Sequence, residues 1–592
     1  MEKAVEEFSL RFEERKDELP KKPFENIALS LSGGGFRATS FHLGVFTYLS
    51  SQTWNGTSLL ERTRILSTVS AGTFMGVKYA ASLKRGETLS DAYRKLHSFL
   101  AKADLVDEAL FYLADDSNWG KGKQRTLINA FAAIYHREFE SDTFGLLWDE
   151  KHESHLKELS FNATEFHFAL PFRFFKTEKS KLSTNLSNEF IGNKKIHIPV
   201  EIAKEVRLSD ITAASSCFPF GFEPINFPDD FCYEGCDKLN STALLPRHVY
   251  DGDRIDYPVG LMDGGIDDNQ GIDAVIVAED RMKKYPPDLK QFCSDDKKAV
   301  DLYLICDVTT PHMESYTSRN KDKIRVGSNW NFEMLRYFGI TSSIVGMTSI
   351  ILAFFASGKL TTIGLTIFGT VGIVNSIVLF IFSLGFSGIT KRLGVSPFFA
   401  QKLSHVDKLK FGLLYKMLAN RQRSVMKMVS KVFLKQIRWF SYERVYGDPQ
   451  WKTRLIMNAA FELTEEEVEK RRKKYSILSE DILDPGPEIM RAAKKGCSMG
   501  TTLWFKPVEL RGEKNLLDTL IACGQFTTCF NLLEYIEKYF KNQEYKSDYD
   551  KYSAETKQEI ERLYSSLLSD WKKFKENPYW MVNEWNNKTK NG

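Results

Sequence analysis

The chain has 592 residues and a net charge of +4, with 27% charged and 13% aromatic residues. Its length allows a large buried core and more than one domain, and its small net charge gives no reason to expect a nucleic-acid partner. The eight cysteines show neither a disulfide framework nor a complete zinc-site spacing, so we expect no metal. No other cofactor is expected either.

In chain order, three units of strand, glycine turn and helix stand out. The strands are expected at 27–31, 64–69 and 259–262, and the helices at 38–50, at 71–84 and from about 271. Two more strands are expected at 161–168 and 301–308. Repeated units of this kind predict an α/β fold with a mostly parallel central sheet and helices on its faces. Functional residues then gather beyond the carboxyl ends of the strands.

Further along, residues 337–390 contain a single charge, Lys359. The charge-free runs on its two sides each exceed the roughly 20 residues that cross a bilayer, and Ser357-Gly358-Lys359 between them predicts a tight turn. We therefore expect a transmembrane helical hairpin with spans at 338–358 and 361–387. A re-entrant or interfacial hairpin and a helical hairpin buried in a soluble core are the alternatives.

Basic segments flank the apolar stretch. Residues 316–336 carry five Lys or Arg against two acids, and residues 391–438 carry twelve against one. The positive-inside rule places both flanks on the cytoplasmic side of the membrane. Residues 399–440 mix cations with apolar side chains at helical spacing, which fits either an amphipathic helix on anionic lipid or a solvated helix.

Ser70 has the surroundings of a nucleophile elbow. It ends an apolar strand and is followed by Ala71, Gly72 and a helix. Such a strained turn lifts the hydroxyl clear of the sheet, and Gly72 lets the helix pass close to the strand. The usual elbow has glycine two residues before the serine, where this chain has Thr68. A serine hydroxyl is also a poor nucleophile without a neighbouring base, so the elbow alone does not identify a site.

A glycine loop, Gly33-Gly34-Gly35-Phe36-Arg37, joins the first strand to the first helix. Backbone N–H groups in such a loop, with the positive end of the following helix, are suited to stabilise an oxyanion. A dinucleotide-binding loop is the alternative, but it requires an acidic residue at the end of the second strand, where this chain has Ser70.

Asp263 stands at the end of the third strand and is followed by Gly264 and Gly265. A carboxylate at this place can lie beside Ser70 and accept its proton. Asp267 and Asp268 are nearby acids, but they follow the turn, and Asp268 is expected to cap the next helix.

The glycine loop, the serine about 35 residues later and the Asp-Gly-Gly about 190 residues after that together resemble the patatin-like phospholipases. Three further stretches are similar to this family, namely FNATEFHFALPFRF (161–174), ITAASSCFPFGFEP (211–224) and TLIACGQFTTCFNLLEYI (519–536). The resemblance covers about 26–310 and, more faintly, about 490–540.

The resemblance implies a three-layer patatin-like fold and a serine hydrolase that cleaves acyl esters of glycerophospholipids, as a phospholipase A or lysophospholipase. It implies a Ser–Asp dyad without histidine, in which Ser70 attacks the ester carbonyl and forms an acyl-enzyme while Asp263 handles the proton. The remaining residues that it implies are an oxyanion hole of Gly33, Gly34, Gly35 and Ala71, with supporting roles for Arg37, Gly72, Gly264 and Gly265.

These expectations combine into a membrane-associated phospholipase with two spans, a catalytic domain facing the cytoplasm, and phospholipid and the bilayer as partners. The expected parts are a charged N-terminal helix (1–25), a catalytic domain (26–315), an insertion with the hairpin and the basic segment (316–449), a helical region that completes the catalytic domain (450–545) and a charged helical tail (546–592). Two alternative functions are a regulated bacterial effector phospholipase that damages membranes and a catalytically inactive lipid-binding membrane module, the latter favoured only by Thr68.

Overall fold

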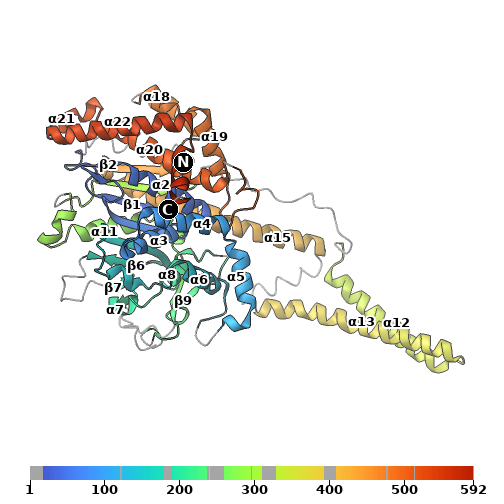
Figure 1. Cartoon of the computed structure of the whole chain (residues 1–592). Helices are drawn as coiled ribbons and strands as arrows, with labels where there is room; N and C mark the ends of the chain where they lie inside the picture. Colours follow the sequence, from blue (N-terminus) through green and yellow to red (C-terminus); the bar gives the residue numbers. More distant parts are fainter. Residues whose placement is uncertain are drawn as a thin grey trace. The chain divides into compact units, whose positions relative to one another are not determined.

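The computed structural model describes residues 18–119, 123–178, 190–219, 221–236, 239, 259–294, 297–309, 329–392, 409–474, 478–512 and 514–590. The chain separates into two compact units, residues 1–313 with 432–592 and residues 314–431 (Figure 1). Most of the expected N-terminal helix and most of the first basic flank lie outside the described residues, as do residues 393–408 of the second flank. The expected domain limits stay predictions.

A mixed sheet organises the first unit. Within the described residues it has ten strands, and its main path runs β12-β11-β1-β4-β5-β6-β7-β8. The first five of these strands are parallel to their neighbours, and the last three continue the sheet in antiparallel pairs. Their bounds are β12 (Leu455–Ala459), β11 (Leu302–Asp307), β1 (Ile27–Leu31), β4 (Thr63–Val69), β5 (Glu158–Glu165), β6 (Leu170–Thr177), β7 (Phe190–Gly192) and β8 (His197–Pro199). A separate small hairpin joins β2 (Thr53–Trp54) to β3 (Thr57–Ser58).

The strand that ends at Asp263 is also antiparallel to its neighbours, although it belongs to one of the three units on which the mostly parallel sheet was predicted. β10 (Val259–Asp263) is antiparallel to β5 and to β9 (Ile225–Phe227). β6 pairs with β5 along its whole length, so β4 and β10 share the other edge of β5. β4 pairs there as far as Asn162, opposite Val69, and β10 continues from Ala163, opposite Asp263. The carboxyl ends of β4 and β10 therefore meet head to head.

Helices cover both faces of the sheet, which confirms the predicted α/β class. Neighbouring residues of β1 belong to different cores, Leu29 to one and Ala28 to the other. The first core includes α2 (Gly35–Ser51), α3 (Ala71–Arg85) and α20 (Leu516–Tyr539), and the second includes α11 (Ile272–Met282). α2 and α20 cross with their backbones in contact, because a Cβ at Gly44 would clash with the Ile521 carbonyl and one at Gly524 with that of Phe41.

Further helices of the first unit complete these layers (Figure 1). They include α4 (Leu89–Lys102), α5 (Leu105–Ala114), α6 (Leu127–Glu138), α8 (Leu208–Ser216), α10 (Gly265–Asp268), α16 (Leu434–Tyr446), α17 (Glu465–Lys474), α19 (Gly486–Cys497), α22 (Ala554–Glu576) and α23 (Trp580–Lys590). α16 falls within the range that we expected for the insertion, yet it packs on α10 and α11 of the first unit.

The second unit contains α12 (Phe332–Phe355), α13 (Lys359–Arg392) and α15 (Phe411–Lys427). α12 and α13 form an apolar pair that packs side by side, with the connecting turn at 356–358. Their seam is made by small residues, because a Cβ at Gly369 would lie 2.7 Å from the Gly346 carbonyl oxygen. Three described helices are long and apolar enough to cross a membrane, and they are α12, α13 and α20.

Candidate active site

Ser70 occupies a strained turn between β4 and α3. Its backbone has φ 54° and ψ −125°, a conformation that residues other than glycine rarely adopt. The Ser70 N–H donates a hydrogen bond to Ser215 Oγ at 2.9 Å, and the Ser70 carbonyl accepts one from the Thr73 N–H at 2.8 Å. This is the geometry of a nucleophile elbow, in which the turn projects the serine from the end of the strand.

Two glycines make room for the elbow. A Cβ at Gly72 would lie 2.5 Å from the Leu31 carbonyl oxygen, so α3 passes directly over the end of β1. A Cβ at Gly76 would lie 2.5 Å from the methyl group of Thr68. Thr68 is fully buried, and its hydroxyl hydrogen-bonds that of Thr73 at 2.9 Å. Because Gly76 of α3 has no side chain, there is room for Thr68 at the position where the usual elbow has glycine.

Asp263 is buried and lies beside Ser70. The Ser70 side chain interacts with the Asp263 carboxyl and acts to lower its pKa, and the Gly265 N–H donates a hydrogen bond to Asp263 Oδ1 at 2.6 Å. Burial raises the pKa of Asp263 to about 6, although the bonds from Ser70 and Gly265 and the charge of Arg438 act to lower it. A carboxyl with this pKa is ionised at neutral pH and still accepts a proton readily.

The meeting of β4 and β10 explains why Ser70 and Asp263 come together. Asn162 of β5 stands at the junction, where its side-chain amide donates to the Thr68 carbonyl and to Ser67 Oγ, each at 2.9 Å. Its carbonyl accepts a 2.6 Å hydrogen bond from the Ser215 hydroxyl. A Cβ at Gly264 would clash with the same carbonyl, so only glycine lets the chain leave β10 here.

The glycine loop lies against the same site. A Cβ at Gly33 would lie 2.9 Å from the Cβ of Ser70, and Gly34 and Gly35 have φ values of 152° and 65°. The Gly33 N–H donates to the Asn269 carbonyl at 3.2 Å. Among the described residues, the N–H groups of Gly34, Gly35 and Ala71 have no hydrogen-bond acceptor. Three N–H groups near Ser70 are therefore available to an oxyanion, whereas that of Gly33 is engaged.

Arg37 lies beneath this loop rather than in open solvent. Its side chain is 8% exposed, and Nη1 donates to the Met499 carbonyl at 2.7 Å. Burial lowers the pKa of Arg37. The guanidinium therefore ties the glycine loop to the segment after α19, which suits a supporting role.

His42 of α2 is the histidine nearest to the glycine loop in sequence, and it too is buried. Its Nε2 lies 3.0 Å from the Ser32 carbonyl oxygen, and burial lowers its pKa to about 4. The neutral ring supports the backbone before the loop and makes no hydrogen bond to Ser70 or Asp263.

Four residues that we did not select from the sequence lie at this end of the sheet: Asn269, Asp307, Arg438 and Tyr442. With the Asn269 amide oriented to satisfy its surroundings, its oxygen accepts from Arg438 Nη2 at 2.6 Å and from Arg438 Nε at 3.0 Å. Asp307 accepts from the Tyr442 hydroxyl at 2.9 Å and from Gln270 Nε2 at 3.1 Å. Arg438 and Tyr442 come from α16, in the stretch where the sequence indicated only a basic amphipathic helix.

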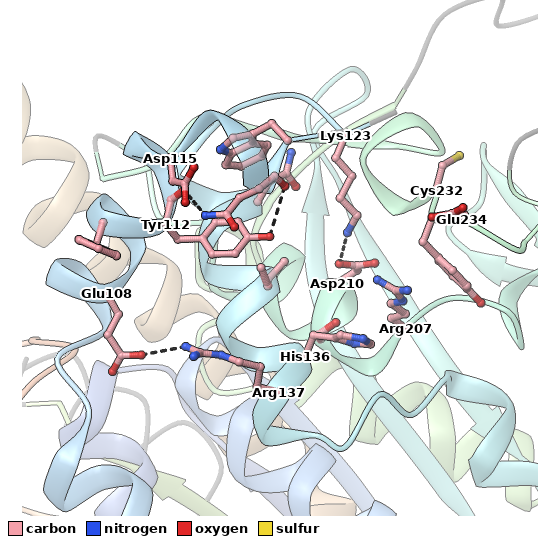
Figure 2. Close-up of a pocket in the computed structure, with 18 of the residues that line it drawn as sticks. Glu108, Tyr112, Asp115, Lys123, His136, Arg137, Arg207, Asp210, Cys232 and Glu234 are labelled. Atoms are coloured by element: carbon pink, nitrogen blue, oxygen red, sulfur yellow. Dashed lines mark hydrogen bonds and ion pairs between the residues drawn. The ribbon is translucent and has the colours of Figure 1, made fainter. Parts of the chain in front are cut away.

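A separate cavity of about 1250 Å³ lies at the amino-terminal end of α8, and neither Ser70 nor Asp263 lines it (Figure 2). Ion pairs cross it from Lys123 to Asp210 at 2.5 Å and from Arg137 to Glu108 at 2.9 Å. Several of its lining residues carry buried polar atoms without a partner in the described part of the chain, namely Trp119, Asn129, His136, Ser209 and Asp210. The lining also includes apolar side chains such as Phe111 and Ala132, so an acyl chain placed there would cover these together with the charged pairs.

Comparison with known proteins adds one match. Residues 29–276 match the family model described as Patatin-like phospholipase, which confirms the resemblance over this range. No curated protein matches the chain. The matched range includes the glycine loop, Ser70 and Asp263, and it ends before α12, α13 and α16.

Proposed function

We propose that this chain, whose residues 29–276 form a patatin-like phospholipase domain, is a membrane-associated hydrolase of glycerophospholipid acyl esters with Ser70 as nucleophile and Asp263 as base. The family consists of serine acyl hydrolases, so lipid esters are the expected substrate class. One observation carries the assignment to residues: a serine on a strained elbow and a buried carboxyl lie at two strand ends that meet on β5, where their side chains interact.

The proposed reaction has two stages. Ser70 Oγ attacks the ester carbonyl carbon while its proton passes to the Asp263 carboxylate, and the N–H groups of Gly34, Gly35 and Ala71 stabilise the oxyanion. The proton on Asp263 then goes to the departing alcohol, which leaves Ser70 acylated. Asp263 takes a proton from water, the resulting hydroxide attacks the acyl-enzyme, and the fatty acid is released as Ser70 regains its proton.

Substitution of the two residues tests this assignment. Ser70→Ala and Asp263→Asn should each lower fatty-acid release from liposomes by about a thousandfold or more, because both belong to one catalytic unit. Asp267→Asn is the matched control, since it removes a neighbouring carboxylate beyond the turn, and its rate should stay close to the wild-type rate. Liposome hydrolysis that persists in Ser70→Ala would rule the dyad out.

A catalytically inactive lipid-binding module is the competing function. Thr68 is the feature that favours it, and the space above Gly76 accommodates that side chain. A fluorophosphonate probe separates the two functions, because it should label the wild-type chain at Ser70 and leave Ser70→Ala unlabelled. An unlabelled wild-type chain would favour the inactive module.

We also propose that α12 and α13 cross the bilayer as a hairpin. Large apolar side chains point outward from both helices, among them Phe354, Phe355 and Leu360, each more than 80% exposed. The glycine seam is typical of helix pairs in membranes, and hydroxyls such as that of Thr366 bond the carbonyl one turn earlier instead of solvent. The chain should resist carbonate extraction from membranes, and release by carbonate would contradict the two spans.

A further inference from the structure

α16 brings a cation from beyond the matched family range to the proposed active site. The Tyr442 hydroxyl bonds Asp307 at the carboxyl end of β11 and fixes the helix there. Asp307 also accepts from Gln270 and from Thr309, so its oxygens are engaged. Its pKa is lowered despite burial, first by the charge of Arg438 and then by these hydrogen bonds. Arg438 lies one turn before Tyr442 and therefore shares its face of the helix.

Asn269 links Arg438 to Ser70. A Cβ at Gly33 would lie 2.9 Å from the Asn269 amide and 2.9 Å from the Ser70 Cβ. The side chains of Asn269 and Ser70 therefore both lie against the Gly33 backbone. The other side of that amide receives the Arg438 guanidinium through Nη2 and Nε. The cation is thus separated from the nucleophile by one short side chain.

The charge of Arg438 is not neutralised by a direct ion pair among the described residues. Its third nitrogen, Nη1, likewise has no hydrogen-bond partner in that part of the chain. Arg438 is half-buried, where charge is screened less than at an open surface. The other arginine of the site, Arg37, is engaged with the Met499 carbonyl. An arginine fork with a free nitrogen is well suited to phosphate oxygens.

We propose that Arg438, positioned by Asn269, forms an anion subsite beside Ser70 that binds the phosphate of a glycerophospholipid. The inference rests on the proposed function, in which Ser70 attacks an acyl ester of the same glycerol backbone. The subsite selects phosphate-bearing lipids over neutral acylglycerols. It also gives α16, which follows the apolar hairpin in the chain, a part in choosing the substrate.

Two substrates with the same acyl ester test the subsite in the full chain. Lysophosphatidylcholine and monoacylglycerol, each in neutral detergent micelles, differ by the phosphocholine group. The assay runs at pH 8.5, where Asp263 is ionised in every variant. Arg438→Ala should lower the ratio of kcat/KM for lysophosphatidylcholine to that for monoacylglycerol about tenfold or more, since a hydrogen bond to a charged group is lost. Arg438→Lys should recover part of it.

Arg444→Ala is the matched control. It removes the same charge from the same helix, but Arg444 pairs with Asp273 of α11, so the ratio should stay at the wild-type value. Where Arg438→Ala does not fold, Asn269→Asp provides the test, because an added carboxylate beside Arg438 should repel phosphate and lower the ratio in the same direction. An unchanged ratio, or equal loss on both substrates, overturns the subsite.

Two further arms separate the possible failures. Ser70→Ala should abolish hydrolysis of both substrates, and if it does not, the proposed function fails whatever the ratio shows. Inorganic phosphate should leave monoacylglycerol hydrolysis unaffected in the wild type. Inhibition by inorganic phosphate that disappears in Arg438→Ala would assign the subsite to free phosphate and overturn the lipid assignment.

Discussion

α20 and the α12–α13 pair are similar in composition and opposite in surroundings. All three helices are long and apolar enough to cross a membrane. The most apolar stretch of α20 is 100% buried in the protein, whereas those of α12 and α13 are 22% and 6% buried. α20 packs between α2, α19 and α22, whereas large apolar side chains of α12 and α13 face outward. Apolarity alone therefore does not identify a membrane span, and the decisive question is what covers the helix.

The strongest test of this contrast introduces a charge into each helix. Phe526 of α20 is fully buried and Ile367 of α13 is 60% exposed. Phe526→Lys should destabilise the first unit by more than about 4 kcal/mol, because it loses a core aromatic ring and buries an ammonium group. Ile367→Lys should leave thermal unfolding of that unit unchanged and disfavour membrane insertion by about 3 kcal/mol. Differential scanning fluorimetry in detergent and carbonate extraction measure the two effects.

The control for this pair is Ile367→Leu, which keeps the apolar surface and should behave as the wild type in both measurements. Equal losses of thermal stability in Phe526→Lys and Ile367→Lys would mean that α13 is a core helix of a soluble protein. The proposed hairpin would then be withdrawn.

Glycine-to-alanine substitutions should distinguish α20 from α13 by a smaller difference in stability. A Cβ at Gly524 of α20 would clash with the Phe41 carbonyl of α2, while a Cβ at Gly364 of α13 meets no atom within 4 Å. Gly524→Ala should lower the free energy of unfolding by about 3 kcal/mol, since two backbones must move apart. Gly364→Ala should be neutral or raise helix stability by up to about 1 kcal/mol. Denaturant unfolding followed by tryptophan fluorescence compares them, and a neutral Gly524→Ala would contradict the close crossing.

The pH dependence of hydrolysis tests whether the catalytic base belongs to the first unit. Burial raises the pKa of Asp263 to about 6, and the base acts in its ionised form. Activity should therefore be constant above pH 7 and fall about tenfold between pH 7 and pH 5. A short-chain soluble ester and liposomes should give the same midpoint, because Asp263 belongs to the first unit. A plateau that continues to pH 4 would exclude a base with the pKa of Asp263.

Local patterns predicted the separate parts of the site. The apolar runs at 27–31 and 64–69 correspond to strands β1 and β4. Ser70 follows the end of β4, and Asp263 is the last residue of β10. These predictions succeed because a buried strand, a glycine turn and a helix each leave a pattern within a few residues. The family match then confirmed the resemblance on which the dyad was based.

Three features depended on contacts that no local pattern contains. The antiparallel direction of β10 was not indicated, because an apolar run of five residues is the same in a parallel and an antiparallel strand. Arg438 was assigned to an amphipathic surface helix, because only its contact with Asn269, far away in sequence, distinguishes it from the neighbouring cations. β12 at 455–459 was likewise missed as a short apolar run within a helical region.

Removal of a single hydrogen bond should give the smallest difference in stability between α20 and the α12–α13 pair. The Thr528 hydroxyl of α20 donates to the Gly524 carbonyl at 2.6 Å and accepts from Asn458 Nδ2 at 2.9 Å. The Ser342 hydroxyl of α12 donates to the Gly372 carbonyl of α13 at 3.1 Å. Thr528→Val should lower the free energy of unfolding by about 1.5 kcal/mol, because it leaves a buried amide without its acceptor.

Ser342→Ala should weaken the hairpin by only about 0.6 kcal/mol, the average for such bonds between membrane helices. The reason is that Gly372 keeps its own helical hydrogen bond, and no buried donor is left unpaired when the serine hydroxyl is removed. Denaturant unfolding in detergent measures both variants, with Thr348→Ala, which loses a bond within α12 alone, as the control. A loss in Ser342→Ala as large as that in Thr528→Val would mean that α12 and α13 are held together as a protein core is, and not as helices in lipid.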